Sequence, residues 1–178
     1  MPTSTEIPIA TTTLASDTVS YTFSSISGSY TDLVLVCSTK AASGHSGNDV
    51  RIDLRFNSDT GSNYSDTYLR GNGTSASSGR DSNRTQIDEV SSIPPNSSSE
   101  YALFTYNIMN YSNSTTYKTV LCRGGMTGTF AGGYNNVGAQ VGLWRSTSAI
   151  TSITIFAQGG NSGVGFASGS TFTLYGIN

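Results

Sequence analysis

The chain has 178 residues, a length that suits one domain and is short for two. Ser, Thr, Gly and Asn make up about half of it, and because Ser, Thr and Asn compete for backbone hydrogen bonds, a helical bundle and a doubly wound α/β fold are excluded. Nine Lys and Arg against eleven Asp and Glu give a net charge of −2, which excludes the basic surface that nucleic acid requires. Ten Tyr and seven Phe still supply enough apolar area for a core, so we expect a folded all-β protein.

The charges are unevenly distributed along the chain. All the acidic residues lie at or before Glu100, so residues 101–178 contain no carboxylate. A surface depleted of charge is typical of the centre of a protein interface. Two interpretations stay open: residues 101–178 provide such an interface, or they form a low-charge sandwich whose outer faces carry neutral hydroxyl groups.

Residues 1–16 have the composition of an extended segment. They contain two prolines, seven Ser or Thr and few apolar side chains, among them Ile7 and Ile9. We predict an N-terminal arm or edge strand here, followed by a single β-sandwich domain over residues 17–178. We further expect the arm to attach to a neighbouring molecule, with Ile7 and Ile9 as its anchors.

Strand patterns follow at short spacing from there to the end of the chain. The predicted strands cover residues 19–23, 33–37, 50–56, 67–70, 87–93, 101–109, 117–123, 137–143, 150–157 and 170–177. Residues 71–84 contain one apolar side chain, Ala76, and are predicted to form a long exposed loop. Many short strands separated by Gly-rich turns predict an antiparallel β-sandwich of nine or ten strands that resembles a jelly roll.

Two of these strands carry informative patterns. In residues 50–56 apolar side chains alternate with Arg51, Asp53 and Arg55, which predicts one buried face and an ion-pair ladder on the other. Residues 33–37 are apolar on both faces, so we expect an adjoining layer to cover the outer side of this strand.

The sequence offers no set of catalytic groups. The only histidine, His45, lies in a Ser/Gly loop without a nucleophile motif, and we expect no enzyme activity. One His and two dispersed Cys do not make a zinc site. Asn57, Asp59, Gly61 and Asn63 have oxygen-ligand spacing, but these residue types are also the common turn formers, and we interpret them as a turn. No metal and no cofactor is therefore expected.

The two cysteines and the apolar runs restrict the cellular setting. Cys37 and Cys122 lie in apolar strand patterns, where buried free thiols are expected, although the sequence does not exclude a bridge between them. No targeting segment is recognisable, and no apolar run approaches the length of a membrane span. We therefore expect no membrane association.

Candidate contact residues come from the aromatic side chains beside polar turns. We select Tyr134 in a Gly/Asn loop and the pair Trp144 and Arg145 at a strand end, together with Ile7 and Ile9 of the arm. Exposed Tyr and Trp suit sugar stacking or a protein interface. The alternative, that the strand-end aromatics close the core, stays open.

Two phrases of the sequence resemble a known module. YTDLVLVCSTK followed by DLRFNSDTGSNYSDTYLRGNG, and the ending AITSITIFAQGG…FASGSTFTLYGIN, resemble a β-sandwich module of virion proteins of tailed bacteriophages, cyanophages among them. With the strands between, the resemblance covers most of residues 20–178. Such modules occur at the ends of tail fibres and as capsid decoration (cement) proteins.

The resemblance implies a structural role on the virion. Because the module takes up nearly all of the 178 residues, we expect a free-standing decoration protein rather than a fibre tip. It would be assembled in the host cytoplasm, bind the major capsid protein at the capsid surface and associate with its own copies. The alternative is a receptor- or carbohydrate-binding module of a tail fibre, which would bind a glycan.

Overall fold

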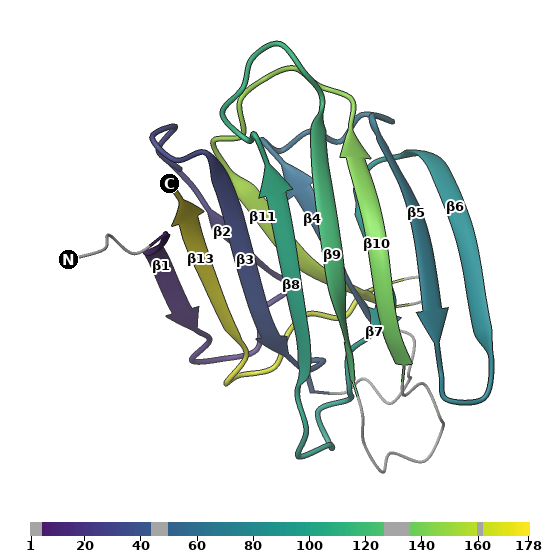
Figure 1. The fold of residues 1–178 in the computed structure, drawn as a ribbon. Helices are drawn as coiled ribbons and strands as arrows, with labels where there is room; N and C mark the ends of the chain where they lie inside the picture. Colours follow the sequence, from purple (N-terminus) through teal and green to yellow (C-terminus); the bar gives the residue numbers. More distant parts are fainter. Residues whose placement is uncertain (1–4, 44–49, 127–135, 160–161) are drawn as a thin grey trace.

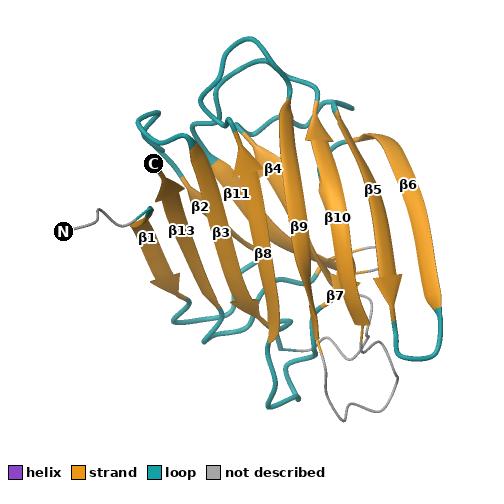
Figure 2. Ribbon diagram, in the orientation of Figure 1, coloured by secondary structure: helices purple, strands orange, loops and turns teal. Residues whose placement is uncertain are grey.

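The computed structural model describes residues 5–43, 50–126, 136–159 and 162–178, and these contain thirteen β-strands and no helix (Figures 1 and 2). The all-β prediction is confirmed. In the described part of the chain no helix is available to cross a membrane.

The strands form two antiparallel sheets packed face to face. The large sheet, in front in Figure 1, has the order β1 (Glu6–Thr13), β13 (Thr171–Ile177), β3 (Asp32–Thr39), β8 (Ala102–Met109), β9 (Lys118–Met126), β10 (Asn136–Trp144), β5 (Tyr64–Gly71) and β6 (Ala76–Arg84). The small sheet behind it has the order β12 (Ser162–Gly163), β11 (Ile153–Gly159), β4 (Arg51–Phe56) and β7 (Ile87–Ser92), with β2 (Ser20–Phe23) also paired to β11.

The connectivity is that of a jelly roll with two inserted hairpins. Without the hairpins β5–β6 and β9–β10 and the short β12, the chain places β1, β3, β8 and β13 in one sheet and β2, β4, β7 and β11 in the other. Successive strands of this set alternate between the sheets, except that β4 and β7 are neighbours in one sheet. This arrangement confirms the predicted jelly-roll-like sandwich. The described chain has thirteen strands where nine or ten were expected, because β1, β6 and β12 add to the predicted set. The inserted hairpins pair with each other and widen the large sheet beyond β8.

Residues 71–84 are not the exposed loop that the sequence predicted. Most of them form β6, which pairs with β5 along its length. The connection is a tight turn in which the Asn72 carboxamide oxygen accepts hydrogen bonds from the backbone of Thr74 and Ser75, and Gly73 adopts a φ of 88°. Because β6 is an edge strand exposed on both faces, it needs no apolar alternation, and the sequence pattern therefore missed it.

The N-terminal segment is an edge strand of its own sandwich. Residues 6–13 form β1 and pair with β13, so the expectation that this segment attaches to a neighbouring molecule is wrong for these residues. Ile9 is partly buried and packs against the core, Leu14 is buried, and Ile7 is only partly exposed. Ile9 thus helps to anchor β1 to its own domain.

The core between the sheets is built from aliphatic and aromatic side chains. At one end Phe172 packs edge-on against Phe166, with ring centroids 5.0 Å apart, and stacks on Tyr21 at 5.7 Å. Cys37 and Cys122 are buried in this interior and are not joined by a disulfide, as the apolar pattern around them predicted. At Gly142 of β10 an added Cβ would lie 2.8 Å from Ile87, so a glycine here allows β7 to pack closely under the inserted strands.

Truncation of the core on either sheet is expected to destabilise the fold. Leu54 and Phe172 are fully buried, so Leu54→Ala and Phe172→Ala should each lower the free energy of unfolding by about 2–5 kcal/mol. Urea unfolding measures the effect, with Val19→Ala at a position that is 60% exposed as the control. Wild-type stability in both core variants would contradict the strand registers.

Deletion of residues 2–14 is expected to destabilise the domain rather than leave it intact. The deletion exposes the edge of β13 and removes Ile9 and Leu14 from the core. Thermal unfolding of the truncated chain should show a lower Tm than that of the full chain. An unchanged Tm would mean that β1 contributes nothing to the fold.

Candidate interaction surface

Trp144, which the sequence analysis selected for contact with a partner, is a core residue. Its side chain is only 2% exposed, and its ring centroid lies 5.6 Å from that of Phe56 and 6.3 Å from that of Tyr64. The indole Nε1 donates a hydrogen bond of 2.7 Å to Asp59 Oδ2. Trp144 is therefore unavailable as an exposed contact, and the alternative that strand-end aromatics close the core applies to it.

The turn at residues 57–63 is organised by Asp59. Besides Trp144, the carboxylate accepts hydrogen bonds from the backbone of Gly61 at 2.8 Å and from Asn63 Nδ2 at 2.9 Å. Burial opposes ionisation of Asp59, but the hydrogen bonds from Trp144, Asn63 and Gly61 outweigh it and lower the pKa of the carboxyl. Burial also raises the pKa of the neighbouring Tyr64 to about 12. These contacts support the interpretation of the motif as a turn.

The other selected residues do not form one site with Trp144. Arg145 is partly exposed, and its guanidinium donates hydrogen bonds to Ser62 O and to Asn83 Oδ1 of β6. β6 is the edge strand of the large sheet that lies farthest from β1. Ile7 and Ile9 belong to β1, at the other edge of the large sheet. Tyr134 and His45 lie outside the described residues.

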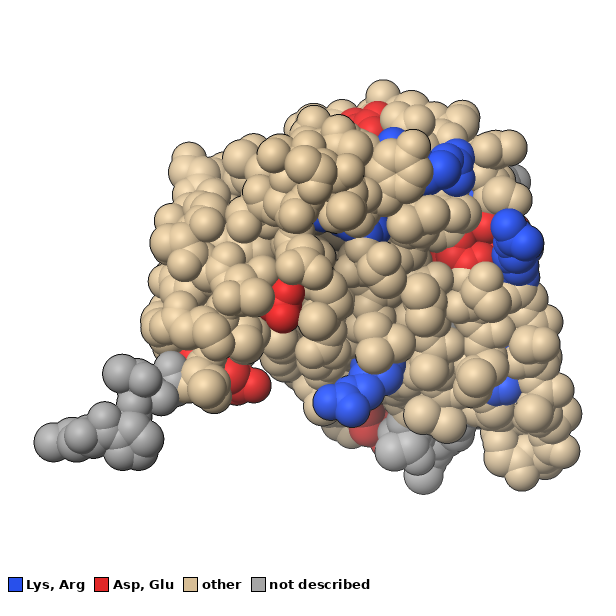
Figure 3. All heavy atoms as spheres, turned by 45° about the horizontal axis from the view of Figure 1, so that its top comes forward, with Lys and Arg blue, Asp and Glu red and all other residues tan. Residues whose placement is uncertain are grey.

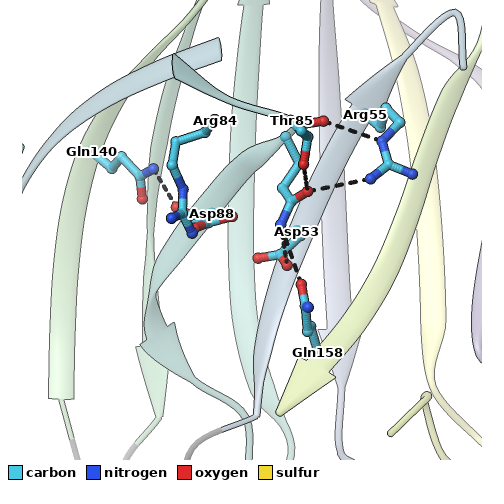
Figure 4. A network of polar contacts seen from close by, with 8 residues as sticks. Asp53, Arg55, Arg84, Thr85, Asp88, Gln140 and Gln158 are labelled. Atoms are coloured by element: carbon cyan, nitrogen blue, oxygen red, sulfur yellow. Dashed lines mark hydrogen bonds and ion pairs between the residues drawn. The ribbon is translucent and has the colours of Figure 1, made fainter. Parts of the chain in front are cut away.

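A cluster of buried polar side chains closes the sandwich beside β4 and β7 (Figure 4). Asp53 is 2% exposed, and Gln86 Nε2 donates to it at 3.4 Å and to Gln158 Oε1 at 3.2 Å. Arg55 donates to Gln86 Oε1 and to Thr85 O, each at 3.2 Å. Asp53 is thus buried in a hydrogen-bonded cluster, not exposed on the polar strand face that the sequence predicted.

The same cluster connects β7 to the inserted strands. Arg84 forms an ion pair with Asp88, and this contact raises the pKa of the guanidinium. Gln140 of β10 donates to the backbone oxygen of Asp88 (Figure 4). The polar side chains of this cluster bind one another and so join neighbouring strands. We therefore assign the cluster a structural role. Among the described residues no three His, Cys, Asp or Glu side chains are grouped to hold a metal ion.

The outer face of the large sheet is the most unusual surface of the described chain. On the four neighbouring strands β8, β9, β10 and β5, alternate side chains point away from the small sheet. We call these residues the apolar outer face. Its large exposed side chains are Leu69, Leu103, Met109, Leu121, Val137 and Val141, which are 45–68% exposed.

Two structural features leave this face open. The small sheet packs against the inner side of the large sheet, as Figure 1 shows, and the described chain has no third layer. The sequence predicted such a layer over residues 33–37; instead Val34 and Val36 of β3 lie partly exposed beside the apolar outer face. The two-sided apolar pattern was therefore a signal for an uncovered sheet face.

The apolar outer face is nearly free of charge. Its register positions on β8, β9, β10 and β5 contain one charged residue, Arg123 of β9, and no carboxylate. Figure 3, which views the molecule from the front and above, likewise shows only scattered charged side chains on a wide neutral surface. Among the described residues no side-chain hydrogen bond or ion pair is found for the Arg123 guanidinium, whereas Arg55, Arg84 and Arg145 all donate to neighbours.

The face is hollowed over β5, β9 and β10. A shallow depression of about 440 Å³ is lined by Leu69, Leu121, Ala139 and Val141, among others. Ala139 stands opposite Arg123 in the β9–β10 pairing, so the Arg123 side chain leaves the sheet beside the hollow. The hollow is therefore an apolar binding surface with one positively charged side chain beside it.

Comparison with protein-family models, with curated proteins and with solved structures finds no match to the chain.

Asp59→Asn is expected to weaken the turn that supports Trp144. The amide leaves one of the donors from Trp144 or Gly61 unpaired, so the free energy of unfolding should fall by about 1–3 kcal/mol at neutral pH. Because the pKa of Asp59 in the folded protein is below its usual 3.8, its ionised form stabilises the fold above that value, and the stabilisation is lost as the pH falls through the lower folded pKa.

Urea unfolding measured from neutral to acid pH checks this prediction. The stability of Asp59→Asn should fall less steeply with acid than that of the wild type, and Asp81→Asn on the edge strand serves as the control. Equal acid dependence in the wild type and Asp59→Asn would show that the Trp144 contact does not control this titration.

Proposed function

We propose that the protein is a non-enzymatic structural protein of a tailed-phage virion, a decoration protein that binds and stabilises the shell of major capsid protein. The resemblance of its strand and turn segments to those of virion modules suggests that the protein belongs to a virion. The observation that carries the proposal is the apolar outer face, which exposes large aliphatic side chains on central strands of a wide sheet. Monomeric proteins rarely leave such a surface uncovered, and it marks an interaction site.

The position of this face favours attachment of a flat body rather than addition of a strand. β8, β9 and β10 are paired on both sides, so their backbone groups are unavailable to an incoming strand. A partner must therefore contact the side chains over an area. This is the geometry that a decoration protein needs in order to lie against a shell.

The alternative, a receptor- or carbohydrate-binding module, would rely on exposed aromatic rings. Trp144 is buried, and the large exposed aromatics of the described residues are Tyr101 and Tyr117 at 39% and 54% exposure. The ring of Tyr101 is partly occupied by Lys40, whose Nζ lies 5.1 Å from its centroid. The apolar outer face therefore gives more support to a protein partner than these rings give to a glycan.

Quantification of the protein in purified particles tests the proposal. We expect the chain in a fixed ratio to the major capsid protein, with antibody label over the whole head in electron micrographs. Particles from a phage with the gene deleted provide the control for antibody specificity.

Two outcomes would contradict the proposal. A few copies confined to the tail, together with binding on a glycan array, would favour the receptor-binding alternative. Complete absence from particles would exclude a virion role.

A further inference from the structure

The lone cation of the apolar outer face restricts what can cover it. Arg123 lies between Thr105 of β8 and Ala139 of β10, and Leu121 and Gly125 are its outward neighbours on β9. No acidic side chain points outward from these strands. A partner that buried this face without a carboxylate would leave a desolvated, unpaired guanidinium, which is strongly unfavourable.

This constraint disfavours a symmetric pair of molecules joined through the face. Most homodimers have two-fold symmetry and join the same patch of both copies. A second copy of the apolar outer face would bring another Arg123 and no carboxylate to the contact. The charge of the face therefore favours a chemically different surface as its occupant.

The hollow beside Arg123 indicates the shape of that surface. Leu69, Leu121, Ala139 and Val141 line a concave apolar area, and protein interfaces concentrate their binding energy where one side chain fills such a pocket. Since Ala139 and Arg123 are direct cross-strand partners, the Arg123 side chain starts within reach of a group seated in the hollow.

We propose that the apolar outer face docks on a shell subunit through a protruding apolar side chain of that subunit, seated over Ala139, and an adjacent carboxylate paired with Arg123. This inference rests on the proposed function and adds the orientation of the protein: the large sheet lies against the shell and the small sheet faces away. Pairing a cation within an apolar contact provides specificity, because a wrong partner leaves the cation unpaired.

Binding of the purified protein to particles that lack it, from the gene-deletion phage, tests the inference. Arg123→Ala should raise the Kd by about thirtyfold or more, as the loss of one partner of a buried charge pair does, and Arg123→Lys should retain part of the affinity. Val141→Ser should also weaken binding. The matched controls are Arg51→Ala on the small sheet and Val19→Ser, both at exposed positions away from the face, and they should bind as the wild type does.

Because the substituted side chains are exposed, all variants should keep the wild-type Tm, which separates binding from folding. The salt dependence of binding should be smaller for Arg123→Ala than for the wild type, because one ion pair has been removed.

The failures of the two proposals are distinguishable. Wild-type binding that Arg123→Ala and Val141→Ser leave unchanged would overturn the docking surface and leave the decoration role standing. No binding of the wild type would overturn both. A concentration-dependent dimer of the free protein, disrupted by Val141→Ser, would overturn the inference in favour of self-association through this face.

Discussion

The pairing of β5 with β10 is the contact on which the width of the large sheet depends. It joins Tyr64–Gly71 to Asn136–Trp144, two segments far apart in the sequence, and so fixes one inserted hairpin to the other. Trp144 stands opposite Tyr64 at the end of this pairing, where Asp59 holds the indole. Ile87 fills the space left by Gly142 and supports the pairing from the inner side. Without these contacts the hairpin β5–β6 would have no partner strand.

This widening also generates the candidate site. The eight strands of the large sheet extend past the strands of the small sheet, and the inserted ones add outward side chains that the basic jelly roll lacks. Leu69, Leu121, Val137 and Val141 all come from inserted strands. The framework strands therefore supply the stable body, whereas the insertions supply the exposed apolar surface.

The sequence predicted the features that depend on overall composition and on the alternation of apolar and polar side chains. The fold class and most strands followed from period-two patterns, because each of these strands has a buried face. The sequence pattern missed β6 because an edge strand that is exposed on both faces buries no side and so shows no apolar alternation. Trp144 was misassigned because its neighbour Arg145 and the following polar turn suggested exposure, whereas Asp59, distant in sequence, satisfies its indole. The apolar outer face was detectable only as carboxylate-free sequence and two-sided strands, and its assembly from four strands required the register.

The pairing of β1 with β13 has a consequence for biosynthesis. Residues 6–13 are synthesised well before their partner strand at residues 171–177, so one edge of the large sheet stays incomplete until those later residues have been translated. A topology dominated by such distant pairings folds slowly, because chain closure must precede the contacts that reward it. Until residues 171–177 emerge, β1 of the nascent chain therefore has no partner strand in the large sheet.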